Sequence, residues 1–200
     1  MLEEILKLDT EIFIFLNNLG TSSFDGFWTF LSRKEANIAV YLSGLLFFLK
    51  NKGFKSYKVK PLDVFYIFSL VLVMILISDQ SANIFKDSFQ RLRPCYNEII
   101  QDSVRLVKES CGGKYGFFSA HASNSFSLAV FFGVLFRDFS KYPIYFTIIY
   151  ASLISYSRIY LGVHYPLDII FGALFGVING ILIYKIHGIM LKSFNLFNKS

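Results

Sequence analysis

Charged side chains are scarce in this sequence of 200 residues, at 17% against roughly 25% in ordinary soluble domains. Cysteine is also rare, and two residues are too few for a disulfide scaffold or a cysteine-rich metal site. Hydrophobic residues make up 54% of the chain, more apolar surface than a soluble domain of this size can bury. The composition therefore excludes a soluble globule, a disordered chain and a nucleic-acid-binding domain, and it indicates an integral-membrane protein.

Apolar runs long enough to cross a bilayer as helices, which takes about 20 residues, recur along the chain. Only helices and closed barrels satisfy backbone hydrogen bonds in lipid, and these runs lack the strict alternation of barrel strands. Five spans are predicted, at residues 27–49, 62–85, 119–136, 142–157 and 166–186. The charged cluster of Arg33, Lys34 and Glu35 interrupts the first span near its start, so we expect that cluster at the interface and residues 36–49 in the membrane core. We therefore expect an all-α fold, an integral-membrane bundle of five to six transmembrane helices that forms a single domain over residues 1–200.

The N-terminal segment, residues 1–20, differs from these runs. Its apolar side chains recur at mixed three- and four-residue spacing, and its charged side chains lie elsewhere on the helical wheel. This pattern predicts an amphipathic helix at the membrane interface, with a short, tilted sixth span as the alternative. The segment lacks the basic start and small-residue cleavage site of a signal peptide, so we do not expect it to be a leader.

The loops divide the basic residues between two sides of the membrane. Five alternating spans place the 50–60 loop, the 137–141 turn and the C-terminal tail together, with ten basic residues, and the positive-inside tendency makes that side cytoplasmic. The other side carries the 86–118 loop and the 158–165 turn. This side holds seven basic residues, which is more than the positive-inside tendency favours for an extracytoplasmic face: Lys86, Arg91, Arg93, Arg105, Lys108, Lys114 and Arg158. This excess predicts an anionic substrate on the extracytoplasmic face.

Two short motifs fall on that outer face. In K-x6-R-P, Lys86 ends the second span, and a continuing helix would bring Arg93 to the same side before Pro94 stops it. Snorkelling or headgroup-binding side chains are the alternative. The motif S-A-H, residues 119–121, opens the third span, where the free N–H groups of a helix N-terminus suit a phosphate. An ordinary capped helix with an interfacial histidine is the alternative.

The third motif, S-R-x5-H-x3-D, spans residues 157–168. Asp168 lies four residues after His164, so in a helical turn its carboxylate can fix the tautomer of the imidazole and stabilise an imidazolium. An acid that only complements the helix dipole is the alternative. Together the motifs bring two histidines, one acid and three cations to one face. Because those cations would repel a divalent metal ion, the combination favours a phosphoryl group over a metal site.

Other residues allow two interpretations. Asp79 lies seven residues before Lys86 on the same helix face, so it is a candidate to support that lysine or another group of the site, or it merely lies at a capped, wet helix end. The remaining outer-loop cations could steer an anionic headgroup or belong to an ordinary solvated loop: Arg91, Arg105, Lys108 and Lys114.

Cysteine and glycine positions also carry expectations. Cys95 and Cys111 both fall in the outer loop. They could form a disulfide worth about 3 kcal/mol in the chain-entropy model, or they could be two free thiols. Gly172, Gly176 and Gly180 recur at four-residue spacing, which favours close helix packing, either within the bundle or between subunits.

The three motifs, in this order, resemble the signature of the type 2 phosphatidic acid phosphatase family, membrane lipid phosphatases related to vanadium haloperoxidases. The resemblance carried by the motifs spans residues 86–168. The second motif of the family usually reads Pro-Ser-Gly-His, and this chain has Phe118 and Ala120 at the proline and glycine positions. Alanine keeps the backbone N–H as a phosphate donor but adds a methyl group in a tight place.

The resemblance implies a role for each motif residue. His164 is the expected nucleophile that forms a phosphohistidine, Asp168 holds and activates it, and His121 is the general acid. The family's phosphate-binding set maps onto Lys86, Arg93, Arg158, Ser119 and the backbone N–H of Ala120. The resemblance also implies that no metal ion or other cofactor is needed, because the basic cluster neutralises the charge.

The resemblance further implies a lipid phosphate or diphosphate in the bilayer as the partner, no nucleic acid, and an oligomeric state that stays open. Bacterial members with similar local strings act on lipid A phosphates, undecaprenyl diphosphate or phosphatidylglycerol phosphate. The basic outer loop favours lipid A, with the 1-phosphate as the expected position. The other two lipids, and broad activity on several lipid phosphates, are the alternatives.

We expect a multi-pass protein of the bacterial inner membrane whose active site faces the periplasm. A non-catalytic carrier of phosphate lipids is the alternative from a different class of protein. A pure binder has no need for His121 opposite His164, or for Asp168 behind it, so the sequence speaks against a carrier.

Overall fold

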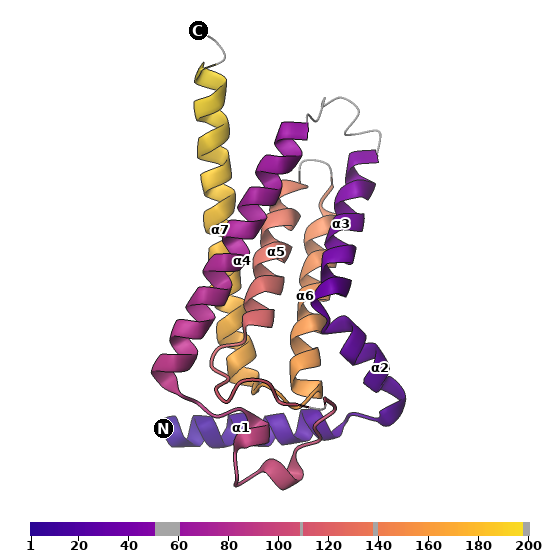
Figure 1. Ribbon diagram of the computed structural model, residues 1–200, viewed down its shortest axis with the longest axis vertical. Coiled ribbons are helices and arrows are strands. Elements are labelled where there is room, and N and C mark those ends of the chain that lie inside the picture. The colour runs from indigo at the N-terminus through magenta and orange to yellow at the C-terminus, as the bar shows by residue number, and fades with distance from the viewer. Residues whose placement is uncertain (51–60, 109, 138–139, 198–200) are drawn as a thin grey trace.

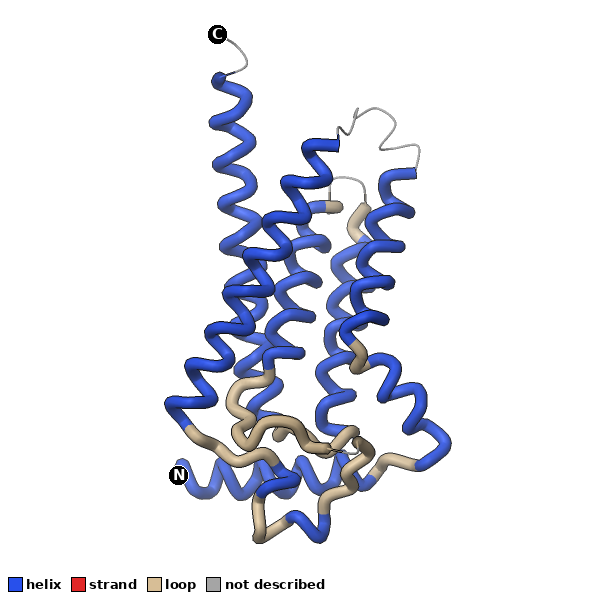
Figure 2. Tube along the Cα trace, viewed as in Figure 1, coloured by secondary structure: helices blue, strands red, loops and turns tan. Residues whose placement is uncertain are grey.

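The computed structural model describes residues 1–50, 61–108, 110–137 and 140–197. Within these ranges the regular elements are seven α-helices and two short 3-10 helices, η2 (Pro94–Tyr96) and η3 (Gln101–Ser103). The α-helices are α1 (Leu2–Asn18), α2 (Ser22–Leu31), α3 (Lys34–Lys50), α4 (Pro61–Phe89), α5 (Ala120–Leu135), α6 (Tyr142–Tyr160) and α7 (Pro166–Phe197). In Figure 2 the helices, drawn in blue, make up most of the trace, and loops connect them. Most of the 50–60 loop lies outside the described residues.

Helices α3 to α7 run along the long axis of the molecule, whereas α1 lies across one end of them (Figure 1). Helix α5 contacts α4, α6 and α7. In α4 and α7, residues Val64–Phe89 and Pro166–Met190 are long and apolar enough to cross a membrane. Helix α5 is apolar but shorter. This is the all-α membrane bundle that the sequence predicts.

Helix α7 packs closely against α5 along its glycine repeat. A Cβ atom added at Gly172 would lie 2.5 Å from the carbonyl oxygen of Ser119, and one added at Gly180 would lie 2.6 Å from that of Ser127. A Cβ atom at Gly176 would likewise collide with the carbonyl of residue 123, between them. Small residues that let two backbones approach are typical of helix contacts in membranes. The repeat therefore serves packing within the bundle, one of the two uses that the sequence allows.

Replacing Gly176 with valine should destabilise this contact. The new side chain would have to displace the backbone of α5, and overpacking of this kind typically costs about 1–3 kcal/mol. Thermal unfolding in detergent should show the variant melting below the parent. Gly26 offers a matched control because a Cβ atom added there meets nothing within 4 Å. If Gly176→Val melts no lower than Gly26→Val, the close approach of α5 and α7 is wrong.

Helix α1 docks on the bundle through a narrow stripe of residues. Asp9, Phe13 and Asn17 are buried and follow one another at four-residue spacing. Apolar side chains elsewhere on the helix stay exposed, including Leu2 at 70% and Phe15 at 64%. A helix that lies across the bundle and keeps apolar side chains on its surface fits the amphipathic, interfacial interpretation rather than a sixth span.

Asn17 fixes the end of α1. Its side-chain amide donates to the carbonyls of Ile159 and Tyr160, both at 3.0 Å, at the end of α6. It also donates to the carbonyl of Arg105 at 3.1 Å, and its oxygen accepts from the Arg105 N–H at 2.7 Å. One buried side chain thus joins α1, α6 and the loop that precedes α5, which places α1 beside the loops of the candidate site.

Two predicted spans differ from the structure by more than a few residues. The span predicted over 27–49 is split, because α2 ends at Leu31 and α3 begins at Lys34. The side chain of Asn37 donates to the carbonyls of residues 31 and 33, so it satisfies backbone groups that the break leaves free. Helix α7 continues to Phe197, past the predicted end at 186, and no proline interrupts residues 187–197.

Candidate active site

The first motif lies at a sharp turn of the chain. Lys86 lies in the last turn of α4, which ends at Phe89. Gln90 then adopts the left-handed conformation, with φ 47°, so that Arg93 lies beyond the helix in extended backbone. The expectation that a continuing helix carries Arg93 and ends at Pro94 is therefore wrong. The left-handed conformation of Gln90 ends the helix four residues before Pro94.

Arg93 is oriented by the part of the loop that returns toward α5. Its Nη1 donates to the carbonyl of Cys111 at 2.7 Å, and its Nε donates to the carbonyl of Tyr115 at 3.2 Å. Its backbone N–H donates to the carbonyl of Lys114 at 3.1 Å. The two side-chain bonds fix the direction of the guanidinium group without using a carboxylate, so its charge stays available to an anion.

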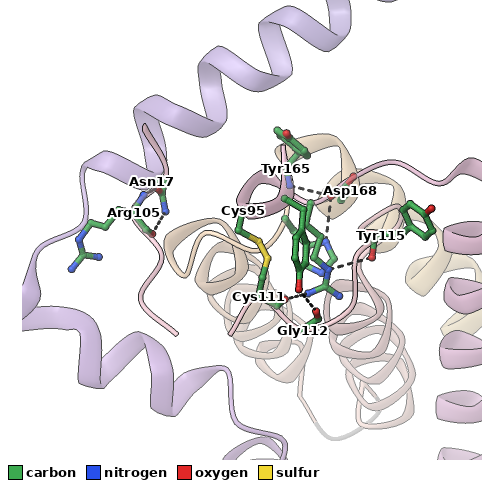
Figure 3. The surroundings of a disulfide bond; sticks show 11 residues. Asn17, Cys95, Arg105, Cys111, Gly112, Tyr115, Tyr165 and Asp168 are labelled. Atoms are coloured by element: carbon green, nitrogen blue, oxygen red, sulfur yellow. Dashed lines mark hydrogen bonds and ion pairs between the residues drawn. A yellow bond between two sulfur atoms is a disulfide. The ribbon is translucent and has the colours of Figure 1, made fainter. Parts of the chain in front are cut away.

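A disulfide between Cys95 and Cys111 closes this loop (Figure 3). The Cα atoms lie 6.3 Å apart, and 16 positions separate the two cysteines in the sequence. Of the two states that the sequence allows, the structure has the bonded one. Because Cys111 also supplies the carbonyl that holds Arg93, the disulfide stabilises the segment that orients this arginine.

Replacing both cysteines with serine should lower the free energy of unfolding by about 3 kcal/mol, the value for a loop of this length in the chain-entropy model. We expect a lower thermal midpoint in detergent, measured without reductant. Reductant should lower the midpoint of the parent toward that of the variant and leave the variant unchanged. Equal midpoints for parent and variant in the absence of reductant would show that the bond carries no stability.

A histidine and an aspartate form a buried pair at the start of α7. His164 Nδ1 lies 3.3 Å from Asp168 Oδ2, and the residues are 2% and 0% exposed. The same carboxylate oxygen accepts from the backbone N–H of Tyr165 at 3.1 Å (Figure 3). Burial, and then the positive charge of Arg93, lower the pKa of His164 well below its usual range. The imidazole is therefore neutral near pH 7, and a carboxylate at Nδ1 leaves Nε2 as the free nitrogen.

The second oxygen of Asp168 is held by a residue that the motifs do not include. Arg91 Nη1 lies 2.9 Å from Asp168 Oδ1, and Arg91 Nη2 lies 2.5 Å from Asp9 Oδ2 on α1. Headgroup steering is thus not the role of Arg91, because two buried carboxylates neutralise its charge. Arg105 is also used inside the protein, where its Nη2 lies 2.6 Å from Asp25 Oδ1.

Arg158 is buried near the end of α6. It is 4% exposed, and its Nη1 donates to the hydroxyl of Ser32, just after α2. Its buried Nε has no hydrogen-bond partner within the described part of the chain. A buried guanidinium with an unpaired N–H is poised to donate to an anion, because leaving it unpaired is costly. The sequence patterns did not single out Ser32.

The N-terminus of α5 is fixed by Ser119. This residue is fully buried, caps the helix by accepting from the N–H of Ala122 at 3.4 Å, and donates its own N–H to the carbonyl of Asp168 at 3.0 Å. The last bond locks the start of α5 against the start of α7. The S-A-H motif thus lies beside the buried histidine–aspartate pair.

One cavity of about 760 Å³ connects these groups. Six residues of the three motifs line it: Lys86, Arg93, Ala120, His121, Arg158 and His164. Ser119 and Asp168 are fully buried beside them. From this charged end the cavity continues along apolar side chains of α3 and α4, such as Leu42, Phe68 and Leu72. An apolar cavity with charged groups gathered at one end suits a ligand that has an anionic head and a hydrocarbon tail.

Asp79 lines the same cavity on α4. Its Oδ1 accepts from the side-chain amide of Asn124 on α5 at 2.8 Å. This bond gives Asp79 a partner on the neighbouring helix, which the sequence did not identify. Across the described residues, no group of three or more histidine, cysteine, aspartate or glutamate side chains is arranged to hold a metal ion.

Sequence reasoning also missed Gly116. A Cβ atom added there would lie 3.0 Å from Asp168 Oδ2 and 3.6 Å from His164 Nδ1, so any larger residue would push against the Asp168 carboxylate. No pattern around residue 116 marks it, because the contact joins segments far apart in the sequence.

The fold and this cavity define a membrane enzyme built to act on an anionic group of an apolar ligand. Comparison with known proteins identifies the family. The sequence profile of the PAP2 superfamily matches residues 63–189, and the chain belongs to this superfamily. It is a lipid phosphatase of the PAP2 family.

Among curated relatives, a lipid A 4'-phosphatase of Porphyromonas gingivalis is 37% identical, covering 93% of this chain and 75% of the relative. A lipid A 4'-phosphatase of Bacteroides thetaiotaomicron is 36% identical, covering 93% of this chain and 80% of the relative. Among solved structures, Aquifex aeolicus LpxE matches with a TM-score of 0.62 and 26% identity over 88% of this chain and 93% of that one. These likenesses extend well beyond the three motifs.

Proposed function

We propose that this protein is a lipid A phosphatase that removes the 4'-phosphate through a phosphohistidine on His164. The buried pair of His164 and Asp168, at the charged end of an apolar cavity, carries the reaction. The position of the phosphate is supported by two relatives that are named lipid A 4'-phosphatases and that each cover 93% of the chain. The sequence alone favours the 1-position, which the experiment below distinguishes.

The first half of the reaction transfers the phosphoryl group to the enzyme. Lys86, Arg93 and Arg158 hold the phosphoryl oxygens together with the N-terminus of α5, where the Ser119 hydroxyl and the Ala120 N–H lie. Nε2 of His164 attacks phosphorus as the bond to the sugar oxygen breaks. His121 donates a proton to that oxygen, and Asp168 stabilises the positive charge that develops on His164.

The second half releases inorganic phosphate. His121, now deprotonated, accepts a proton from water as the water oxygen attacks phosphorus and the bond to Nε2 of His164 breaks. The imidazole returns to its neutral state and His121 to its protonated state, so protons balance over the cycle. The cations that bind the ground-state phosphate also neutralise the charge that spreads over its oxygens in both transition states.

The charge of the cavity supports a headgroup with more than one anionic group. Among the described residues, four basic side chains line it and Asp79 is the acidic one: Lys34, Lys86, Arg93 and Arg158. The same cavity offers apolar walls to acyl chains along α3 and α4. A multiply charged glycolipid such as lipid A uses both features, whereas a single phosphate monoester would leave part of the positive charge unpaired.

Two observations support an active site on the periplasmic side of a bacterial inner membrane. The disulfide lies at the end of the bundle that carries the site, and disulfides persist in oxidising compartments. The opposite end, where Arg137 and Lys141 flank the turn between α5 and α6, carries the loops assigned to the cytoplasm by the positive-inside tendency.

The test uses purified protein in detergent and lipid A labelled with ³²P at either the 1- or the 4'-position, with chelator present. We expect the label to be released from the 4'-position and activity to persist in chelator. Undecaprenyl diphosphate at the same surface concentration should react more slowly. Release from the 1-position alone would overturn the assigned position, and faster release from undecaprenyl diphosphate would overturn the assigned lipid. Loss of activity in chelator would contradict the metal-free reaction.

A further inference from the structure

We propose that Asp9, on the N-terminal helix α1, is a positioning residue for Asp168 and acts through Arg91. The inference rests on the proposed roles of His164 and Asp168. Asp9 lies outside the three motifs, on a helix that the sequence assigns only to the membrane interface. The structure nevertheless connects it to the candidate catalytic pair by two separate routes.

The first route is an ion-pair chain through side chains. Asp9 Oδ2 lies 2.5 Å from Arg91 Nη2, and Arg91 Nη1 lies 2.9 Å from Asp168 Oδ1. Asp9 is 3% exposed and Asp168 is 0% exposed, and the Arg91 side chain between them is 19% exposed, so both ion pairs are largely shielded from water and weakly screened. The guanidinium also lies 4.1 Å from the ring of Tyr165, which limits its movement out of the carboxylate plane.

The second route is a backbone contact at the start of α7. Asp9 Oδ1 accepts from the N–H of Leu167 at 2.8 Å, directly before Asp168 in the chain. The first N–H groups of a helix have no partner within the helix, so an acidic side chain satisfies one of them here. One carboxylate therefore holds both the arginine that binds Asp168 and the backbone that carries it.

Loss of the Asp9 carboxylate would affect the reaction through the orientation of Asp168. Arg91 binds Oδ1 of Asp168, and this leaves Oδ2 directed at His164 Nδ1 and the Tyr165 N–H. Without Asp9, one end of the guanidinium loses its partner, and Arg91 is free to move. The Asp168 carboxylate can then rotate away from the imidazole. Such a change would slow the attack of His164 without altering the cations that bind the phosphate.

The test compares kcat and KM for lipid A in Asp9→Asn and the parent. Asparagine has nearly the same shape and can still accept from Leu167, but it loses the charge that holds Arg91. We expect kcat to fall about 10-fold or more, on the scale seen when residues that orient metal ligands are replaced, with KM within about twofold. Asp25→Asn is the matched control, because it removes a carboxylate from another ion pair that joins a helix to the same loop. Its kcat should match the parent.

A double variant shows whether Asp9 acts through Arg91. Asp9→Asn combined with Arg91→Gln should be no slower than Arg91→Gln alone, because the shared route is already broken. If the two effects multiply, or if Asp9→Asn has the kcat of the parent, the proposal is overturned. Should Asp9→Asn fail to fold, Arg91→Lys replaces it. Lysine keeps the charge but cannot present two fixed nitrogens to two carboxylates, so an unchanged kcat there would also overturn the proposal.

The failure of this inference can be distinguished from that of the proposed function. His164→Ala and Asp168→Asn are measured in the same assay. If both of these are inactive while Asp9→Asn has full kcat, only the role of Asp9 fails. If His164→Ala keeps full activity, the proposed reaction itself fails, and with it this inference.

Discussion

Replacing His164 with alanine is expected to reduce the release of phosphate from lipid A by about 10⁴-fold or more, as loss of a covalent nucleophile does in other enzymes. The buried imidazole has Asp168 at one nitrogen and lines the cavity where the basic residues gather. Alanine leaves these cations in place, so the variant should still bind the lipid. Binding in detergent and the rate of phosphate release are the two quantities to measure.

The matched control is His187→Ala. His187 is also buried, at 8% exposure, and it lies on the same helix as Asp168, about five turns further along. Its imidazole packs beside the ring of Tyr66 rather than in the cavity. We expect this variant to keep the activity of the parent. Equal losses in His164→Ala and His187→Ala would indicate general damage to the bundle and would contradict the assignment of the nucleophile.

Replacing Arg158 with alanine is expected to lower kcat/KM by about 10³-fold, the scale of a single arginine that stabilises phosphoryl transfer. Its buried Nε has no partner among the described residues, and the residue lines the same cavity as His164. Arg158→Lys should recover little of this loss, because an ammonium group cannot present the planar set of donors that fits a phosphate. Steady-state kinetics on labelled lipid A measure both variants.

Ser32→Ala separates binding of substrate from simple support of the arginine. The variant removes the hydroxyl that accepts from Arg158 and leaves the guanidinium itself in place. We expect a loss of less than about 10-fold, the lower end for a residue that only orients another. If Ser32→Ala is as slow as Arg158→Ala, or if Arg158→Lys works as well as the parent, direct contact between Arg158 and the phosphate is contradicted.

Hydrophobic runs and local spacing predicted most of the fold. Each long apolar run was assigned to a helix, because a segment in lipid must satisfy its backbone hydrogen bonds internally. The positions of the runs along the chain then gave the order of the long helices. The glycine repeat correctly predicted close packing for α7. The charged cluster of Arg33, Lys34 and Glu35 interrupts the run predicted over 27–49, and the structure places the break between α2 and α3 at this cluster. The bonds of the Asn37 side chain that complete the helix ends there carry no signal in the sequence.

For the candidate site, the three motifs identified the residues at the charged end of the cavity, but not the residues that hold them. Arg91 looks like any cation of an exposed loop, and only its contacts with Asp9 and Asp168 show otherwise. Asp9 and Asn17 belong to the polar residues of an amphipathic helix, yet they are the ones buried against the protein. Such contacts join residues that lie far apart in the sequence, so local patterns carry no signal for them.

The most direct test of the proposed reaction is to identify the residue that carries phosphate during turnover. Purified protein is mixed with lipid A labelled with ³²P, quenched with alkali within one turnover, digested and analysed by mass spectrometry. Phosphohistidine survives alkali, so the label is expected on the peptide that contains His164 and on no peptide of His164→Ala. Full turnover with the label on another residue, or with no labelled peptide at any time, would contradict a reaction through a phosphohistidine on His164.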